Sequence, residues 1–462
     1  MGEFRTHMNN EELRRNKYRR KKAMLRKVQN KMGVAFFVII LVLFALAVRI
    51  LLINYNHGEA YSKTVLDHQS YTSTTIPYKR GQIQDANGTV LAYSERVYNL
   101  ILDPKLILSD EKYKEPTLTA LTECFDLKRS DLESILATKS TSQYEKLLKE
   151  LTKDEISEFE SRVEDTKNNP YIKGVWFEDS YIRKYPFSTL AADVIGFASA
   201  ANGGELGLEN YYDEELSGTD GISYSYVGEN LDVETQEKKA EDGYNLVTTI
   251  DYKVQSIIEN KIKELNAERP SKSTAVIAMN PKTGEILAMA SYPTFNLNNP
   301  RDLSGVYTQE ELSTMTDIEM TDAMYALWSN YCVSTIYEPG STFKPFTVAE
   351  GLEEGVIHDG DTFYCGGFME GSGSIINCHE HSGHGTVTVK EGLIQSCNPT
   401  MMQIAAKLGG VKIAKYEALF GFGNRTGIDL PGEEAGLTIG EKMTVIDAAC
   451  NSFGQNINVN MV

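Results

Sequence analysis

The stretch "STAVIAMNPKTGEILAMASYP", Ser273 to Pro293, decides the fold of the second half of this chain. It holds two nearly continuous apolar runs, 272–280 and 285–291, on either side of an Asn-Pro-Lys-Thr-Gly turn. Runs that are apolar throughout are typical of strands covered on both faces, and Gly284 can supply the positive φ that a tight turn needs. The sequence therefore predicts a hairpin in a central sheet that is covered by helices.

The flanking sequence extends this unit in both directions. Upstream, "EDGYNLVTTIDYKVQSIIENKIKEL" predicts a strand and then a helix entered at Thr249–Asp251. Downstream, apolar periodicity predicts helices at 389–408 and 411–420. We expect a domain boundary between 235 and 245.

The first half has a different pattern. Residues 60–100 look extended, with an Asn87-Gly88 turn between strand-like runs. Residues 109–170 are highly charged and helical in pattern, with Ser130 and Thr152 as expected capping residues. An α+β domain is therefore expected here.

The N-terminus predicts a membrane anchor. Residues 33–53 read "GVAFFVIILVLFALAVRILLI", with Arg49 as the only charge, and about 20 apolar residues cross one bilayer. The basic cluster "RRNKYRRKK" precedes this span, which keeps the N-terminus in the cytoplasm and places Asn54 onward outside. Ala45-Leu46-Ala47 resembles a signal-peptidase site, but the apolar residues after it favour an uncleaved anchor.

The net charge of −18 is unevenly distributed. Residues 1–32 hold eleven Lys/Arg and three Glu, a net charge of about +8, which leaves about −26 for the rest. An acidic bulk of this size argues against a nucleic-acid-binding protein.

A serine and a lysine stand three residues apart in "EPGSTFKPF", Glu338 to Phe346. If a helix begins near Ser341, the side chains of Ser341 and Lys344 share a face, and a desolvated lysine can accept the hydroxyl proton. The helix N-terminus can hold an oxyanion. The pattern thus suits an acylated serine nucleophile, although taken alone it also fits an N-cap serine beside a solvated lysine.

About fifty residues later the chain reads Ser396-Cys397-Asn398. The Asn398 amide can hold a substrate carbonyl and orient the lysine, and the Ser396 hydroxyl can relay a proton to a leaving amine. A helix cap at Ser396 or Asn398 is the simpler alternative.

With these motifs the chain resembles the class B penicillin-binding proteins, the monofunctional D,D-transpeptidases of peptidoglycan synthesis. The resemblance extends over nearly all of 33–462. The motifs that carry it are Arg80-Gly81 with Asp85 and Asn87-Gly88, Arg183 with Tyr185-Pro186, "GELGLENYYDEELSGTDG", "TTIDYKVQ", "NPKTGEILAMASYPTFNLN", "EPGSTFKPF", "SCNPTMM", "FGFGNRTGIDLPGE" and "SFGQ". Departures from the family pattern are Ala86 in place of Arg, Cys397 in the middle of the S-x-N, and Asn456 in place of Gly.

The resemblance implies an N-terminal transmembrane helix, an α+β pedestal (dimerisation) domain, and an α/β penicillin-binding transpeptidase domain with helices around a mainly antiparallel sheet. The expected segments are a basic cytoplasmic tail (1–32), the anchor (33–53), the pedestal (54–238) and the transpeptidase domain (239–462). The family's catalytic K-T-G strand follows the S-x-N, but the K-T-G of this chain, Lys282–Gly284, lies in the predicted hairpin turn. The transpeptidase domain is therefore expected to be C-terminally incomplete, with the true motif in residues after Val462.

The implied function is D,D-transpeptidation of peptidoglycan stem peptides by Ser341, Lys344, Ser396 and Asn398, with Ser341 and Asn398 contacting substrate. β-Lactams would acylate the same serine, and no cofactor is required. An inert membrane-anchored scaffold is the alternative, because the K-T-G strand is missing. A β-lactamase or penicillin sensor lacks such a pedestal, and the pedestal does not resemble the glycosyltransferase of class A enzymes. The implied partners are the membrane, a SEDS-family glycosyltransferase, and other division or elongation proteins.

The segment "CGGFMEGSGSIINCHEHSGHG" concentrates metal-ligand side chains between the two motifs. Thiolates and imidazoles are the ligands that zinc prefers, and a structural site needs four. The candidates are Cys365, Cys378, His379, His381 and His384. A Cys365–Cys378 disulfide outside the cell and a loop with neither feature are the two alternatives.

Overall fold

The computed structural model describes Lys17, residues 41, 44–46, 48 and 49, and the ranges 70–199, 203–227, 233–371 and 374–462. The chain divides into two compact units, Met1–Thr75 with Ile222–Lys238, and Ile76–Gly221 with Lys239–Val462. The expected basic tail and most of the expected anchor lie outside the described residues. No helix within the described residues is long and apolar enough to cross a membrane.

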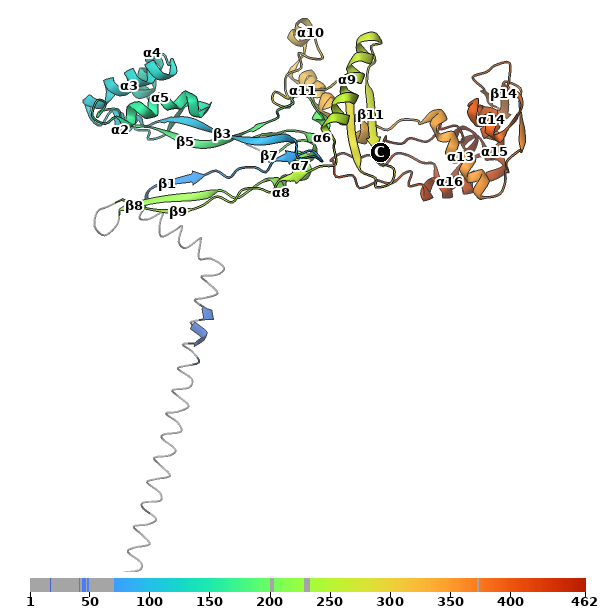
Figure 1. Cartoon of the computed structure of the whole chain (residues 1–462), viewed down its shortest axis with the longest axis horizontal. Coiled ribbons are helices and arrows are strands. Elements are labelled where there is room, and N and C mark those ends of the chain that lie inside the picture. The colour runs from blue at the N-terminus through green and yellow to red at the C-terminus, as the bar shows by residue number, and fades with distance from the viewer. Residues whose placement is uncertain are drawn as a thin grey trace, which may run out of the picture. The chain divides into compact units, whose positions relative to one another are not determined.

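The first unit contains a three-stranded sheet in the order β1-β8-β9 (Figure 1). Its strands are β1 (Ser70–Ile76), β8 (Gly221–Val227) and β9 (Val233–Lys238). The last two are antiparallel, with Ile222 opposite Lys238.

The second unit begins with a five-stranded sheet in the order β10-β2-β3-β4, in which β5 also pairs with β3. Its strands are β2 (Ile83–Gln84), β3 (Val90–Leu102), β4 (Glu145–Leu151), β5 (Val175–Lys184) and β10 (Leu246–Val247). The predicted Asn87-Gly88 turn is confirmed: Gly88 has φ +85, and Asp85 Oδ1 accepts from the backbone N–H groups of Asn87 and Thr89.

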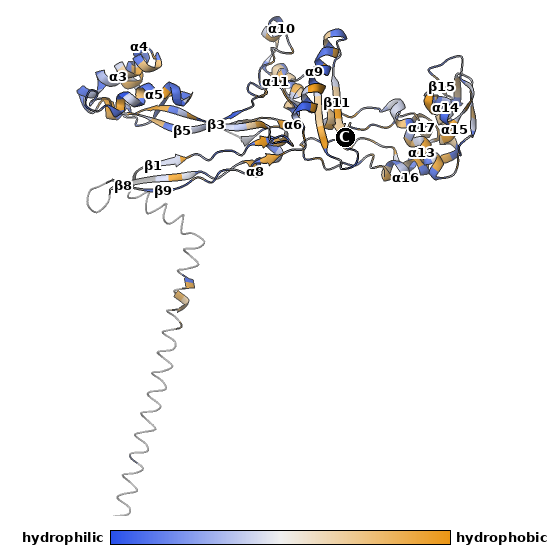
Figure 2. Cartoon of the chain, in the orientation of Figure 1, coloured by the Kyte–Doolittle hydropathy of each residue, from blue (hydrophilic) through white to orange (hydrophobic). Residues whose placement is uncertain are grey.

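Helices cover one end of this sheet (Figure 1). They are α2 (Pro104–Ile107), α3 (Glu111–Phe125), α4 (Arg129–Thr138) and α5 (Lys153–Glu164). Leu100, Leu118, Leu132 and Phe159 are fully or almost fully buried between them and β3. Most residues of α5 are hydrophilic (Figure 2), and its buried residues are Ile156 and Phe159. An amphipathic pattern of this kind fixes which face of each helix meets the sheet.

The prediction of helix throughout 109–170 is wrong at 145–151. This segment is strand β4, in which Leu148 pairs with Leu100 of β3 and Leu151 pairs with Tyr98. Pairing with a strand distant in sequence satisfies its backbone groups and overrides its local helix preference. The predicted cap at Thr152 is confirmed as a capping box with Glu155, whereas Ser130 lies inside α4, whose N-cap is Lys128.

A buried charge network lies between this sheet and the short elements after it. Those elements are α6 (Ala192–Ile195), β6 (Ala198–Ser199), β7 (Gly203–Gly204), α7 (Gly207–Tyr211) and α8 (Asp213–Leu216). Glu209, which is fully buried, accepts from Arg80 Nε at 2.7 Å, Arg183 Nε at 2.6 Å and Tyr185 OH at 3.2 Å. Charge-assisted bonds from two arginines offset the cost of burying this carboxylate.

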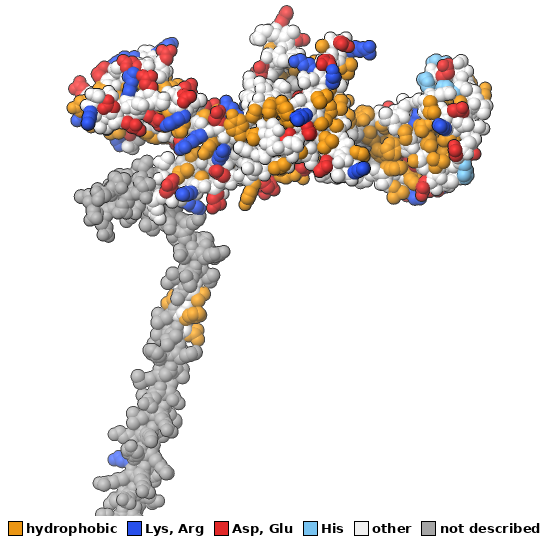
Figure 3. All heavy atoms as spheres, viewed as in Figure 1, with side chains coloured by type: hydrophobic (Ala, Val, Ile, Leu, Met, Phe, Trp, Pro, Cys, Tyr) orange, Lys and Arg blue, Asp and Glu red, His pale blue; other side chains and the backbone are white. Residues whose placement is uncertain are grey.

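The predicted hairpin and its helix are confirmed. Strands β11 (Thr274–Met279) and β12 (Ile286–Tyr292) are antiparallel, with Gly284 at φ +79 in the turn. Helix α9 (Tyr252–Glu268) packs on β12, and Asp251 caps its N-terminus. The expected cover on both faces is not seen in the described residues: β11 and β12 form a two-stranded sheet, in which only Ala288–Ala290 are fully buried. Exposed hydrophobic side chains lie in the middle of Figure 3, where α9 and β11 lie in Figure 1.

The elements after α12 form a helical subdomain that carries the candidate site (Figure 1). Its core contains Val348, Met401, Ile404 and Ala448. Before it come α10 (Gln309–Thr314), α11 (Asp317–Trp328) and α12 (Tyr331–Ser334). Its own elements are η1 (Gly340–Phe343), α13 (Lys344–Glu353), β13 (Thr362–Cys365), β14 (Phe368–Gly371), β15 (Ser374–Asn377), β16 (Gly385–Thr388), α14 (Val389–Ile394), α15 (Asn398–Leu408), α16 (Gly410–Leu419), η2 (Gly440–Lys442) and α17 (Val445–Asn451).

Candidate active site

Ser341 and Lys344 lie where a 3-10 turn, η1, becomes the α-helix α13. Pro345 occupies the first turn of α13, where its missing N–H leaves no bond unmade. Ser341 is exposed, whereas Lys344 is only 1% exposed. The serine is therefore open to a substrate, and the lysine lies in the interior.

Lys344 Nζ makes three hydrogen bonds, all to the S-x-N segment. It donates to Ser396 O at 2.6 Å, to Ser396 Oγ at 2.9 Å and to Asn398 Oδ1 at 2.8 Å. Ser396 Oγ in turn lies 2.9 Å from Ser341 Oγ and donates to it. The structure thus brings all four predicted residues together, with Ser396 Oγ between the serine hydroxyl and the lysine amine.

This arrangement differs from the direct Ser341–Lys344 contact that the i, i+3 spacing suggested. Among the described side chains, Ser396 is the hydrogen-bond partner of Ser341 Oγ, because the three donor positions of the lysine face the S-x-N segment. A hydroxyl can donate and accept at once, so Ser396 can pass a proton from one partner to the other.

Burial of Lys344 lowers the pKa of its ammonium below its ordinary value, because desolvation disfavours the charged form. The neutral amine, which is the form that can accept a proton, is therefore more accessible than in an exposed lysine. The neutral amine of Lys344 can thus accept the proton of the Ser341 hydroxyl through the Ser396 hydroxyl, and it can later return that proton by the same path.

The S-x-N segment has an unusual backbone. Ser396 has φ +52, which ends α14 and allows α15 to begin at Asn398. The predicted continuous helix 389–408 is thus two helices with this turn between them. Neither Ser396 nor Asn398 acts as a helix cap, since the N-cap of α15 is Cys397 and it makes no side-chain capping bond.

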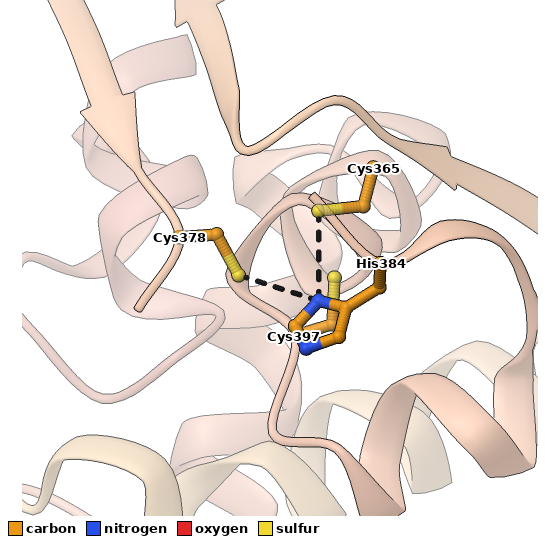
Figure 4. Close-up of side chains that lie close together, drawn as sticks. All are labelled: Cys365, Cys378, His384 and Cys397. Atoms are coloured by element: carbon orange, nitrogen blue, oxygen red, sulfur yellow. Dashed lines mark hydrogen bonds between the residues drawn. The ribbon is translucent and has the colours of Figure 1, made fainter. Parts of the chain in front are cut away.

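Three cysteines and one histidine lie together beside this turn (Figure 4). The ligand atoms of Cys365, Cys378, His384 and Cys397 all lie within 4.8 Å of one another. His384 Nδ1 is 3.6 Å from the Sγ atoms of both Cys365 and Cys378. The group could hold a metal ion.

The predicted ligand set is partly correct. Cys365, Cys378 and His384 belong to the group, but His379 and His381 do not, although His379 Nδ1 is 3.9 Å from Cys378 Sγ. Sequence reasoning missed Cys397, which it treats only as the middle residue of the S-x-N. The available signal was a third thiol within about twenty residues of Cys378. All six cysteines are free.

Glycines make the loop geometry of this group possible. A Cβ on Gly367 (φ +90) would lie 2.1 Å from His381 O, and one on Gly383 (φ +80) would lie 2.4 Å from Cys365 O. Two backbone segments therefore pass in direct contact, and this close approach brings His384 to Cys365.

The thiols of this group differ in acidity. Burial raises the pKa of the Cys365 thiol, but hydrogen bonds with His384 and the backbone outweigh it and lower the pKa to about 7. Burial raises the pKa of the Cys397 thiol to about 11. The Cys365 thiol can therefore lose its proton near neutral pH, and a deprotonated thiol is the form that binds a metal ion.

Two family models match the chain. The penicillin-binding protein dimerisation domain matches residues 75–248, and the penicillin-binding protein transpeptidase domain matches residues 274–462. The two matched ranges thus correspond to the two domains of one class of protein, and Ser341 lies in the second range. The chain belongs to the class B penicillin-binding proteins, the family of the peptidoglycan D,D-transpeptidases.

Curated relatives agree with this. Stage V sporulation protein D of Bacillus subtilis is 32% identical over 399 residues, which cover 84% of this chain and 56% of the relative. The peptidoglycan D,D-transpeptidase MrdA of Acinetobacter baumannii is 26% identical over 423 residues, which cover 86% and 59%. The chain thus spans somewhat more than half the length of these relatives.

Solved structures show the same fold. Penicillin-binding protein 2X of Streptococcus thermophilus superposes with a TM-score of 0.68 at 24% identity, over 85% of this chain and 58% of that chain. The penicillin-binding protein PBP2 of Helicobacter pylori, solved in complex with MreC, superposes with a TM-score of 0.65 at 21% identity, over 84% and 74%.

Proposed function

We propose that this protein is a serine acyltransferase that cross-links peptidoglycan stem peptides by D,D-transpeptidation, with Ser341 as the nucleophile. The hydrogen-bonded set of Ser341, Ser396, Lys344 and Asn398 is the observation that carries this proposal. It supplies a nucleophile, a relay and a desolvated base in contact, which is what covalent acyl transfer requires.

In the acylation step, Ser341 Oγ attacks the carbonyl carbon of the penultimate D-Ala. Rotation of the two hydroxyls lets the Ser341 proton move to Ser396 Oγ while the Ser396 proton moves to neutral Lys344 Nζ. The backbone N–H of Ser341 is one donor for the oxyanion. When the C–N bond breaks, the proton returns from Lys344 to the leaving amine of D-Ala.

In the second step, an amine of a neighbouring stem peptide attacks the ester carbonyl while Lys344 accepts the proton of that amine. When the C–O bond of the ester breaks, this proton passes through Ser396 Oγ to Ser341 Oγ, which restores the serine hydroxyl and the neutral lysine. Asn398 keeps the lysine in place through its Oδ1, while its Nδ2 donates to Asn377 O at 3.2 Å. Rotation away from Asn377 would free this amide for a substrate carbonyl. A β-lactam would acylate Ser341 by the same first step.

A catalytically inert scaffold is the second candidate. One observation favours it: the K-T-G of this sequence, Lys282–Gly284, lies in the β11–β12 turn, with Gly284 in the left-handed conformation the turn needs. In that case the pedestal would serve to bind other wall-synthesis proteins.

Labelling with a fluorescent penicillin separates the two candidates. We expect covalent labelling of the wild-type chain, complete loss in Ser341→Ala, and wild-type labelling in Ser313→Ala, which removes an exposed hydroxyl of α10. Labelling that persists in Ser341→Ala would exclude Ser341 as the nucleophile. A folded wild-type chain that is never labelled would favour the scaffold.

We further propose that Cys365, Cys378, His384 and Cys397 bind a structural zinc ion. Tetrahedral zinc, with bonds of about 2.3 Å to sulfur and about 2.0–2.1 Å to nitrogen, separates S and N ligands by roughly 3.6 Å. The 3.6 Å distances from His384 Nδ1 to two thiols match this value. Since Cys397 lies between Ser396 and Asn398, the ion would hold the backbone turn that positions these two residues in place.

Metal analysis of the reduced, purified chain tests this site. About one equivalent of zinc is expected in the wild type and in His381→Ala, and far less in Cys397→Ser. Chelation should lower the melting temperature together with penicillin acylation. Less than about a tenth of an equivalent of zinc in the wild type, with a Cys365–Cys378 bridge found by mass spectrometry, would refute the proposal.

The sequence and the family support a membrane location. We propose a single-pass anchor at 33–53, a cytoplasmic N-terminus, and both domains outside the membrane. A wall-assembly protein of the MreC kind, a SEDS-family glycosyltransferase and other division or elongation proteins are the proposed partners of the pedestal. Active reporter fusions on the cytoplasmic side at Asn54 would contradict this topology.

A further inference from the structure

Two carboxyl side chains and an amide are buried where helices α13, α16 and α17 pack together. Glu350 on α13 and Glu417 on α16 are each 1% exposed, and Asn451 at the end of α17 is fully buried. Charged side chains are almost never buried this completely unless they are paired. The group therefore needs a physical explanation.

The hydrogen bonds of this group are incomplete. Asn451 Nδ2 donates to Glu417 Oε1 at 2.6 Å. Six buried side-chain polar atoms lack a partner in the described part of the chain, and four are in this group: Glu350 Oε1, Glu350 Oε2, Glu417 Oε2 and Asn451 Oδ1. All four are oxygens that can only accept when the carboxyls are ionised, so a donor is what the group lacks.

The surrounding elements offer no buried cation to this group. On α16, Lys412 and Lys415 pair with Glu354 at the surface. On α15, Lys407 lies over the Phe363 ring. On α13, Lys344 is bonded to the S-x-N segment and Glu353 is exposed. The other titratable groups of the neighbouring helices are Lys390 and Glu391 on α14, Tyr416 on α16, and Asp447 and Cys450 on α17.

We propose that Glu350 and Glu417 share a single proton, with protonated Glu350 donating to Glu417 at neutral pH, and that this carboxyl pair fixes α13 to α16 and α17. One proton removes one of two buried charges and supplies the missing donor. Burial, with a contribution from the charge of Glu417, raises the pKa of Glu350 to about 8. Burial also raises the pKa of Glu417.

The pair is connected to the candidate nucleophile through α17. Thr347 Oγ1, one turn before Glu350, donates to Ser452 O at 2.9 Å, and Ser452 follows Asn451. The N–H of Gly340, which precedes Ser341, donates to Gly454 O at 2.9 Å. Glu350 is therefore a positioning residue for Ser341 and Lys344. This role rests on the proposed acyl transfer, but the shared proton is independent of it.

The sign of the pH effect follows from the raised pKa. An isolated glutamate in the unfolded chain releases its proton near pH 4.5, whereas the folded pair holds a proton to about pH 8. Between these values the folded state binds more protons than the unfolded chain. The stabilisation contributed by the shared proton is therefore fully present at low pH and is lost as the pH rises. The unfolding constant rises by up to about tenfold per pH unit across this window, and above it the effect is constant.

The test compares Glu350→Gln with Glu353→Gln, an exposed change on the same helix, in the full chain. A glutamine side chain in place of Glu350 is neutral at every pH and can donate to Glu417. The melting temperature of Glu350→Gln should therefore rise relative to the wild type between pH 5 and pH 8, while Glu353→Gln stays parallel to it. In the infrared spectrum at pH 7, a protonated-carboxyl band should be lost in Glu350→Gln and kept in Glu353→Gln.

Two results would overturn the proposal: an infrared band at pH 7 that is identical in both variants, or melting curves of Glu350→Gln that run parallel to the wild type from pH 5 to pH 8. If Glu350→Gln does not fold, Glu417→Gln replaces it, since it removes the same second charge and should flatten the pH dependence. None of these measurements uses penicillin, so they fail independently of the proposed acyl transfer. Acylation by penicillin is then a separate readout: it should fall above pH 8 in the wild type and be maintained in Glu350→Gln.

Discussion

Replacing Ser396 tests the relay most directly, because the structure separates what its hydroxyl does from what its backbone does. In Ser396→Ala, Lys344 Nζ loses its bond to Ser396 Oγ but keeps Ser396 O at 2.6 Å and Asn398 Oδ1 at 2.8 Å. The lysine stays buried with two of its three acceptors. The loss of stability should therefore be that of one hydrogen bond, about 1–2 kcal/mol.

The effect on acylation should be much larger. Ser396 Oγ is hydrogen-bonded to both Ser341 Oγ and Lys344 Nζ, so its removal interrupts this path for the proton. General acid–base catalysis is typically worth about 10²–10⁴ in rate, which corresponds to roughly 2.7–5.4 kcal/mol in activation free energy. We expect penicillin acylation of Ser396→Ala to slow by that factor while its melting temperature changes little.

Ser396→Gly is the matched control, because residue 396 has φ +52. Glycine adopts this conformation without the cost of roughly 1 kcal/mol that a Cβ adds, so Ser396→Gly should be more stable than Ser396→Ala. Both variants lack the hydroxyl and should acylate equally slowly. The assay is the single-turnover rate of fluorescent penicillin labelling, with thermal melting alongside. Acylation of Ser396→Ala within about threefold of the wild type would refute the relay.

Three further expectations follow from the structure. Because burial lowers the pKa of Lys344, wild-type acylation should rise with pH up to about pH 8 as the amine loses its proton; a rate that falls with rising pH below pH 8 would contradict a lysine base. Glu209→Ala leaves Arg80 and Arg183 buried without their shared partner, so it should destabilise the pedestal by about 3–5 kcal/mol in urea unfolding. The control Arg129→Ala, which removes an ion pair at the surface, should leave the unfolding midpoint unchanged. Similar midpoints for the two variants would show that the buried network is not stabilising. Lys282→Ala in the β11–β12 turn should leave penicillin labelling unchanged, and a large loss would make this K-T-G part of the site after all.

The sequence determined the features whose causes are local. The β11–β12 hairpin follows from two apolar runs around a glycine that must adopt positive φ, and α9 follows from the side chain of Asp251, which accepts from the N–H groups at its start. The capping box at Thr152 is equally local. The spacing of Ser341 and Lys344 and the later S-x-N, taken together with the family resemblance, named the four residues that the fold brings together.

The features that depend on residues distant in sequence were decided only by the tertiary structure. Strand β4 has a helical pattern and becomes a strand because β3 satisfies its backbone. Cys397 joins Cys365 and His384 because the turn at Ser396 and two glycine contacts bring three loops together. Glu350 and Glu417 are charged residues on amphipathic helices, and such residues usually face water. Their burial depends on how α13, α16 and α17 pack, and no local pattern encodes that packing because each helix is compatible with several partners.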